Sequence, residues 1–145
     1  MFGENEIIGE KTINIDGKNR IILPSFTGVE IKDKLIPQLN VDNNILFIYG
    51  IDVFNKKDEK FNEFLSKTKM SYEKIRKIQR LYYEKLSFMP EEVDSSKRIV
   101  IPSRAITKLE LTDKVFVIGN GHHLEIYKSK GIYERVQEER KRRGR

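Results

Sequence analysis

The 145-residue chain contains no cysteine and no long run of apolar residues. The absence of cysteine excludes disulfides, thiolate zinc sites and cysteine nucleophiles. A membrane-spanning helix needs about 18 or more consecutive apolar residues, and the sequence has no such stretch. The N-terminus also lacks the basic region and apolar stretch of a signal peptide. We therefore expect an intracellular protein without a membrane span.

Catalytic signatures are absent as well. The sequence has no Walker loop and no glycine-rich dinucleotide fingerprint. His122 and His123 are neighbours, so in a strand their side chains would face opposite ways, and the Gly119-Asn120-Gly121 turn before them favours loop histidines. Carboxylates are plentiful, but nothing in the pattern brings them to one place. The sequence predicts no catalytic residue, no cofactor and no metal site.

The composition is that of a basic globular protein. Hydrophobic residues make up 38% of the chain and charged residues 34%, with a net charge of +6. A chain of this length suits one compact unit or two small halves that share a core. The excess of positive charge favours a polyanionic partner without proving one.

One sequence pattern occurs twice. Residues 16–25 read Asp-Gly-Lys-Asn-Arg-Ile-Ile-Leu-Pro-Ser, and residues 94–103 read Asp-Ser-Ser-Lys-Arg-Ile-Val-Ile-Pro-Ser, 78 positions later. Each copy places a polar, basic turn directly before a short apolar strand that ends at a proline. The closing segments 46–49 and 124–127 are separated by the same offset, so we infer a duplicated unit.

The hydrophobic pattern predicts mostly strands within the two copies. After Pro24 the chain is weakly helical at best because Gly28 interrupts it, whereas Ser103 is expected to cap a short helix that runs to Leu109. The remaining strands are expected at 7–15, 21–23, 35–36, 45–49, 100–101, 115–118 and 124–127, with turns at 40–44 and 119–121.

Apolar residues fall at helical spacing between the copies. Two helices are expected from Asn55 to Leu86, and Ser71 is the expected N-cap of the second. Tyr82, Tyr83 and Phe88 could form a base-stacking platform, but their helical spacing favours a core or subunit contact.

The C-terminal tail looks helical from Gly131 and ends in a run of basic residues from Arg140 to Arg145. This run could follow a DNA backbone or remain a solvated end. We expect its basic end to be disordered in the free protein and to add weak, non-specific binding.

The repeated Asp-x-x-x-Arg turn is the best candidate for a functional site. A guanidinium group matches phosphate oxygens and the O6/N7 edge of guanine, and the aspartate four residues earlier can hold it in one rotamer. A local salt bridge that only shapes the turn is the competing interpretation. Because the turn occurs twice in a basic chain, we favour a DNA contact made by Arg20 and Arg98, with Lys18 and Lys97 beside them.

These residues resemble a known family. Gly9-Glu10, Ile15-Asp16, Lys18, Arg20 and Pro24 resemble the opening of the MraZ transcriptional regulators, and 94–102 resembles the second copy of the family's motif. The resemblance covers about residues 7–133, with the closing strands and the helical pair in the expected places. The family's turn glycine is Asn19 in the first copy and Lys97 in the second, so we expect the second turn to differ in shape.

The resemblance implies an α+β, mostly β fold in which two AbrB-like swapped-hairpin (double-psi-like) repeats are related by a pseudo-two-fold axis. It implies a first repeat at 7–54, a helical connector at 55–88, a second repeat at 89–132 and a helical or disordered basic tail at 133–145. The DNA-binding residues that it implies are Asp16, Lys18, Arg20, Asp94, Lys97 and Arg98, with Arg20 as the stronger candidate.

The same resemblance implies a cytoplasmic, nucleoid-associated repressor of its own division and cell-wall operon, which binds direct repeats in double-stranded DNA as a ring-shaped homo-oligomer. Two alternatives remain open. An antitoxin of the same superfamily would bind a toxin protein, although such proteins usually carry one hairpin unit and a long tail. A non-specific RNA-binding protein would bind unrelated sequences equally and with a steep salt dependence.

Overall fold

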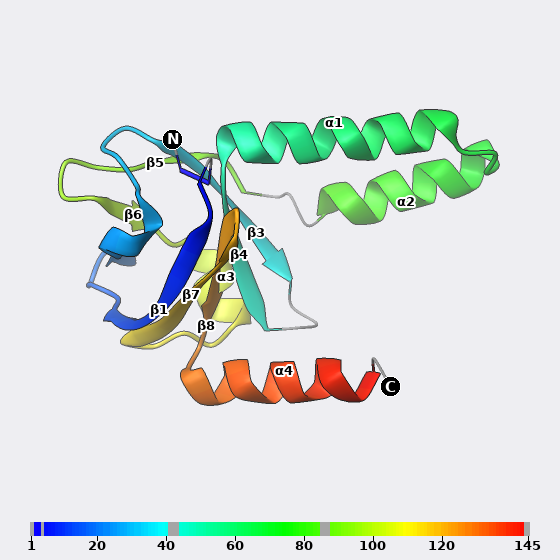
Figure 1. The fold of residues 1–145 in the computed structure, drawn as a ribbon. Helices are drawn as coiled ribbons and strands as arrows, with labels where there is room; N and C mark the ends of the chain where they lie inside the picture. Colours follow the sequence, from blue (N-terminus) through cyan, green and yellow to red (C-terminus); the bar gives the residue numbers. More distant parts are fainter. Residues whose placement is uncertain (1, 4, 41–43, 85–87, 144–145) are drawn as a thin grey trace.

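The computed structural model describes residues 2–3, 5–40, 44–84 and 88–143 (Figure 1). Strands and short helices alternate in each half, and two longer helices separate the halves. The elements in chain order are β1 (Ile7–Asn14), β2 (Arg20–Ile22), the 3-10 helix η1 (Ser25–Thr27), β3 (Lys34–Asn40), β4 (Ile45–Gly50), α1 (Ile51–Lys67), α2 (Tyr72–Glu84), β5 (Glu91–Glu92), β6 (Arg98–Val100), α3 (Ser103–Lys108), β7 (Lys114–Gly121), β8 (His123–Tyr127) and α4 (Lys130–Arg143).

The two halves exchange their first strands. The large sheet has the order β1-β7-β8-β4-β3-β5, and its neighbouring strands all run antiparallel. β1 from the first half pairs with β7 of the second, and β5 from the second half pairs with β3 of the first. This exchange confirms the α+β, swapped-hairpin fold that the family resemblance implies.

In the described part of the chain, β2 and β6 pair with each other and with no other strand. Ile21 lies opposite Ile99, which makes this residue pair the midpoint of a pseudo-two-fold arrangement. Two further backbone bonds cross between the copies: Leu23 N–H donates to the Lys97 carbonyl at 2.9 Å, and Ile101 N–H donates to the Asn19 carbonyl at 2.7 Å. Each copy therefore completes the strand of the other.

The main hydrophobic core lies between the β2–β6 pair and the inner face of the large sheet. It includes Ile21 and Ile99, which are 1% and 2% exposed, together with inward-facing residues of β4, β7 and β8. A second cluster lies under α4, where Val136 packs against Ile45, Phe116 and Tyr127. The main core thus draws on both copies, as expected for two small halves that share a core.

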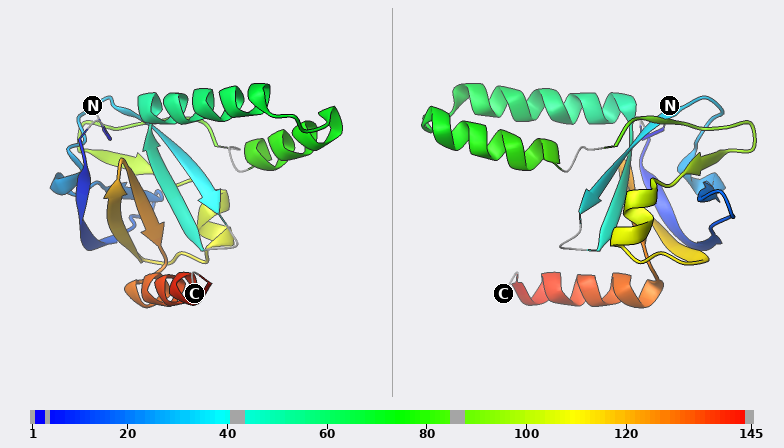
Figure 2. Two further views of the ribbon diagram at one scale, coloured as in Figure 1. Left: turned by 45° about the vertical axis from the view of Figure 1, so that its right-hand side comes forward. Right: turned by 180° about the vertical axis from the view of Figure 1, so that it is seen from behind.

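The long helices lie at opposite ends of the strands of the large sheet. α1 and α2 form a helical arm that starts directly after β4 at one end, and α4 packs at the other end, near Ile45 and Tyr127 (Figures 1 and 2). α1 begins at Ile51, earlier than the sequence pattern predicts. Ser71 caps α2 as expected, because its Oγ accepts the Lys74 N–H at 3.3 Å.

Several local predictions need correction. Residues 119–121 belong to β7 rather than to a turn, and the hairpin reverses around His122 after Gly121, whose φ is 82°. Pro102, not Ser103, occupies the N-cap of α3, and Ser103 begins the helix without a side-chain cap bond. The prediction for η1 is confirmed, since Gly28 ends it in a left-handed conformation. The predicted turn at 40–44 falls largely on residues 41–43, outside the described residues.

The shared midpoint generates a stability prediction. Ile99→Ala removes buried methyl groups from the contact between the copies, so we expect the free energy of unfolding to fall by about 2–5 kcal/mol in a urea titration. Ile22→Ala, one residue from the midpoint but 61% exposed, should change it by less than about 0.5 kcal/mol. Equal losses in the two variants would contradict this account of the core.

Candidate nucleic-acid interface

The first turn (residues 16–20) is organised by one carboxylate. Asp16 Oδ1 accepts the backbone N–H groups of Lys18 at 2.9 Å and of Arg20 at 2.8 Å. Its other oxygen, Oδ2, accepts the Arg20 side-chain Nε–H at 2.8 Å. Aspartate favours such turns because its short side chain reaches the backbone two residues ahead. The same side chain therefore closes the turn and orients the guanidinium group.

The second turn (residues 94–98) repeats this network. Asp94 Oδ1 accepts the N–H groups of Ser96 and Arg98, each at 2.9 Å, and Oδ2 accepts Arg98 Nε–H at 2.9 Å. Asn19 and Lys97 occupy the matching left-handed position with φ of 60° and 59°. The expectation that Lys97 changes the shape of the second turn is therefore wrong, since the aspartate bonds and the cross-copy bond at the Lys97 carbonyl hold both backbones alike.

Both aspartates are stabilised as anions. The backbone N–H of Arg20 is the main cause that lowers the pKa of Asp16, followed among the stabilising contacts by the N–H of Lys18 and the Arg20 side chain. The pKa of Asp94 is lowered in the same way, mainly by the backbone N–H of Arg98. The carboxylates therefore remain charged at neutral pH and stay hydrogen-bonded to the two arginines.

The outer face of the β2–β6 pair presents both arginines. Ile21 and Ile99 point into the core, so alternation along each strand places Arg20, Ile22, Arg98 and Val100 on the opposite face. Arg20 lies opposite Val100, and Arg98 lies opposite Ile22. Among the described residues, each arginine side chain is bonded through Nε alone, so its Nη groups remain available to a ligand.

The structure brings the six predicted residues together on one side of the molecule. Lys18 and Lys97 are exposed at the tips of the two turns, next to Arg20 and Arg98. The basic C-terminal run does not join them. Residues 140–143 form the last turn of α4 rather than a disordered end, and this end of α4 lies away from β6 in Figures 1 and 2. Of the three aromatic residues considered as a stacking platform, Phe88 packs against the main core, and the side chains of Tyr82 and Tyr83 lie outside the described part.

Sequence reasoning missed a buried polar cluster on β8. Glu125 is 3% exposed, and its Oε2 accepts Asn120 Nδ2–H at 2.7 Å and lies 3.1 Å from His123 Nε2. Its Oε1 accepts the Tyr127 hydroxyl at 2.5 Å. His123 also packs on the rings of Phe47 and Tyr49. The cluster was missed because His123 was expected in a loop. The alternation of polar residues 123, 125 and 127, which lie on one face of a strand, was the signal that could have identified it.

The cluster determines the charge state of Glu125. Burial by itself raises the pKa of Glu125, but hydrogen bonds from His123, Asn120 and Tyr127 outweigh burial and lower it to about 2. Burial and the bond to Glu125 raise the pKa of Tyr127 above its ordinary range. A buried carboxylate with this many partners stabilises the strand that carries it and is not poised for proton transfer at neutral pH.

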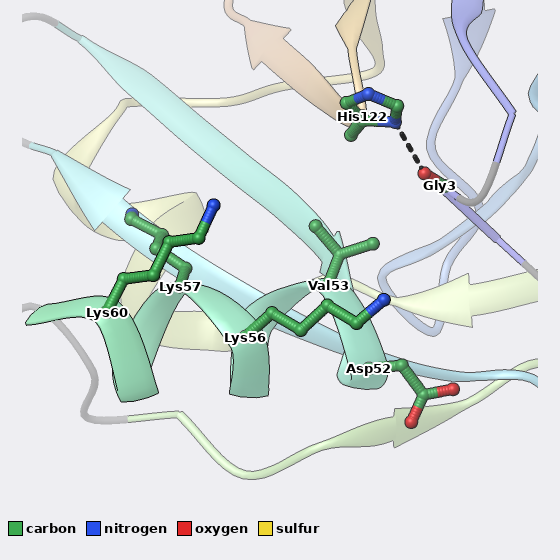
Figure 3. Close-up of a pocket in the computed structure, with 7 residues that line it drawn as sticks. All are labelled: Gly3, Asp52, Val53, Lys56, Lys57, Lys60 and His122. Atoms are coloured by element: carbon green, nitrogen blue, oxygen red, sulfur yellow. Dashed lines mark hydrogen bonds between the residues drawn. The ribbon is translucent and has the colours of Figure 1, made fainter.

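A second basic region lies at the start of α1. A pocket of about 420 Å³ is lined by Gly3, Asp52, Val53, Lys56, Lys57, Lys60 and His122. Figure 3 shows that Lys56 extends toward Asp52, whereas Lys57 and Lys60 extend to the other side of Val53. Lys57 Nζ lies 3.3 Å from the Tyr49 hydroxyl and 3.4 Å from Gln38 Oε1. Because the ammonium groups diverge, this pocket does not form a single anion site.

Within the described ranges, no group of three or more histidine and acidic side chains is arranged to hold a metal ion. The helices of the described part include none that is long and apolar enough to cross a bilayer.

The fold and the paired turns define an AbrB-like swapped-hairpin protein with two units fused in one chain. Comparison with known proteins identifies it further. The chain belongs to the MraZ family, which consists of transcriptional regulators and not of enzymes. A family model described as "MraZ protein, putative antitoxin-like" matches residues 90–143, which include the second turn and α4.

Three relatives are each named "Transcriptional regulator MraZ". The protein of Alkaliphilus metalliredigens is 30% identical over 122 residues, covering 84% of this chain and 80% of its own length. That of Mycoplasmoides gallisepticum is 30% identical over 123 residues, covering 83% and 80%. That of Halothermothrix orenii is 29% identical over 123 residues, covering 85% and 81%. The similarity therefore spans both copies and confirms the resemblance found in the sequence.

The buried cluster generates a pH prediction. The folded-state pKa of Glu125 is depressed to about 2 from 4.5, so its stabilising contribution is present above about pH 4.5 and is lost as the pH falls toward 2. We expect Glu125→Gln to lower the free energy of unfolding at pH 7 by about 1–3 kcal/mol, and to lower it less at pH 3.5. The exposed α4 variant Glu138→Gln should show no such difference in urea titrations. A loss that is the same at both pH values would contradict the assignment.

Proposed function

We propose that the protein is a sequence-specific DNA-binding repressor of its own division and cell-wall operon, which assembles as a ring and binds direct repeats. The observation that carries this proposal is the pair of matching turns. Each holds an arginine of the outer face of the β2–β6 pair by Nε and leaves its Nη groups without a partner among the described residues. Charged donors fixed in this way suit base edges and phosphates.

The proposed roles follow from the geometry of the turns. Arg20 and Arg98 reach base edges or phosphates through their Nη groups, while Asp16 and Asp94 restrict the arginine rotamers and so reduce the entropy lost on binding. Lys18 and Lys97, exposed at the tips of the turns, supply phosphate contacts that carry no sequence information. Because the two networks match within 0.1 Å at each bond, both arginines are assigned the same role, in place of the sequence-based preference for Arg20.

One subunit offers few contacts, so affinity has to come from several. Linking sites raises avidity by about 10² to 10⁴ when their spacing matches the target. A ring of subunits matches regularly repeated sites only if the ring deforms or the DNA bends, and bending a short site costs about 1–6 kcal/mol. We propose that distortion of the ring absorbs part of this mismatch.

The biological setting of the proposal rests on the relatives. Their shared name supports a role in transcription, and such a protein would act in the cytoplasm on nucleoid DNA. The description of the family model as antitoxin-like favours one alternative, a protein-binding module that neutralises a toxin. Co-purification of a stoichiometric small partner protein would support that alternative, whereas recovery of DNA with regularly spaced repeats would support the regulator.

The first test concerns the arginines. Arg20→Ala and Arg98→Ala should each weaken binding about 10- to 100-fold in gel-shift titrations, because each removes one bidentate contact. The probe is a duplex selected from a random-sequence pool by the wild-type protein. Arg76→Ala removes the same charge from α2 in the helical arm and should bind within about twofold of wild type. Wild-type affinity in both turn variants would contradict the proposed interface.

The second test concerns assembly. Native mass spectrometry at physiological ionic strength should detect one closed oligomer of several subunits, because isolated subunits present too few contacts for useful affinity. If a monomer binds the selected duplex as tightly as the oligomeric protein is expected to, the proposed ring is contradicted, whereas the proposed DNA binding is not.

A further inference from the structure

A cleft adjoins the proposed DNA-binding face on one side. It has a volume of about 570 Å³ and lies between β1, the segment that follows β2 and the second turn. Lys11, Asn14, Ser96 and Lys97 are the polar wall residues that concern binding, and Ser25 also lines the cleft. All five are exposed, and Ile22, which shares a strand face with Arg20, also lines the cleft. We call this feature the β1 cleft.

The chain itself explains why the β1 cleft forms. Leu23 N–H donates to the Lys97 carbonyl at 2.9 Å, which fixes the second turn beside the end of β2. β1 runs past this junction because it crosses to pair with β7. The exchange of strands between the copies therefore brings Lys11 of the first half and Lys97 of the second to the same cleft.

The pseudo-two-fold axis relates this side to a second position beside β5. Asn14 faces Lys114 at the start of β7, and Glu92 faces Lys34 at the start of β3, so the two junctions correspond. Counting along the chain from these anchors, Met89 matches Lys11, Glu91 matches Ile13 and Glu92 matches Asn14. Lys34 and Lys114 occupy matching places and do not distinguish the sides.

The two sides consequently differ in charge. Among the described residues, the wall of the β1 cleft carries Lys11 and Lys97 and no carboxylate. On the β5 side, Lys18 takes the place of Ser96 and Asn19 that of Lys97, while the carboxylates of Glu91 and Glu92 take the places of Ile13 and Asn14. Two symmetric turns are thus flanked by unequal electrostatic surfaces.

We propose that the β1 cleft binds backbone phosphates of the DNA and that the acidic β5 side does not, so that each subunit sits on its site in one orientation. DNA phosphates bind where cationic side chains lie close to hydroxyl or amide donors, and carboxylates repel them. A binding unit with true two-fold symmetry would accept a site equally in both directions. The unequal sides remove that ambiguity and give successive subunits the same direction along the DNA. This inference rests on the proposed function.

The experiment exploits the absence of cysteine in the chain. Ser25→Cys places a single thiol in the β1 cleft, and Ser103→Cys places one at the matching position of the second copy. Each thiol carries an iron chelate that cleaves nearby DNA by hydroxyl radicals, and the probe is the duplex selected by the wild-type protein. We expect each reagent to cut on one flank of every bound site, and the two reagents to cut on opposite flanks.

Charge variants connect this orientation to the cleft. In a background with Lys11→Met, Glu91→Gln and Glu92→Gln, both reagents should cut both flanks, because the sides then have more nearly equal charge. Log affinity falls as log salt concentration rises. Lys11→Met alone should make this negative slope shallower by about 0.9, as expected for the loss of one phosphate contact. Lys74→Met, an exposed lysine of the helical arm, should leave the slope and the cutting pattern unchanged.

The outcomes separate the two proposals. If each reagent cuts both flanks of bound DNA in the protein without charge substitutions, the orientation proposal is overturned. The proposed function would then remain in place. One-sided cutting that persists in the triple variant would also overturn the orientation proposal, since the cleft would then not determine the direction. Failure to select any preferred duplex would instead overturn the proposed function itself.

Discussion

The backbone exchange at the β2–β6 pair is the constraint on which the other features depend. Leu23 and Ile101 each donate to the carbonyl of the left-handed residue in the opposite turn. Because of these two bonds, neither copy can form its turn and strand without the other. Ile21 and Ile99 bury the inner face of the pair in the core, so the outer face is the one accessible to solvent and to a ligand. Stability and presentation of the arginines thus have the same structural origin.

The aspartates illustrate how one side chain serves both needs. Each uses one oxygen to close its turn and the other to bind Nε of its arginine. An arginine held in this way is restricted in its rotamers, and its remaining donors have no partner among the described residues. The interpretations that the sequence left in competition, a turn-forming salt bridge and a ligand contact, are therefore compatible. The salt bridge is the means by which the contact would be positioned.

The structure divides the basic charge of the chain among separate surfaces. The turns and the β1 cleft lie together, whereas the α1 pocket and the end of α4 lie elsewhere (Figures 1 and 3). Net charge alone predicted a polyanionic partner but could not show which cations act together. Net charge also could not reveal the acidic flank formed by Glu91 and Glu92. The difference between the two flanks is seen only when the two copies are superimposed about their axis.

The sequence by itself determined the duplicated unit, its strands and the Asp-x-x-x-Arg turns, because these depend on neighbouring residues: turn chemistry, alternation and a terminal proline. It gave the wrong shape for the second turn, since the low intrinsic preference of Lys97 for a left-handed conformation is overridden by bonds from Asp94 and from Leu23 of the other copy. It also missed the cluster around Glu125, which depends on a hairpin placed two residues later than expected. Only the tertiary structure decided the strand exchange and the inequality of the two sides, because both arise from contacts between segments about 80 residues apart.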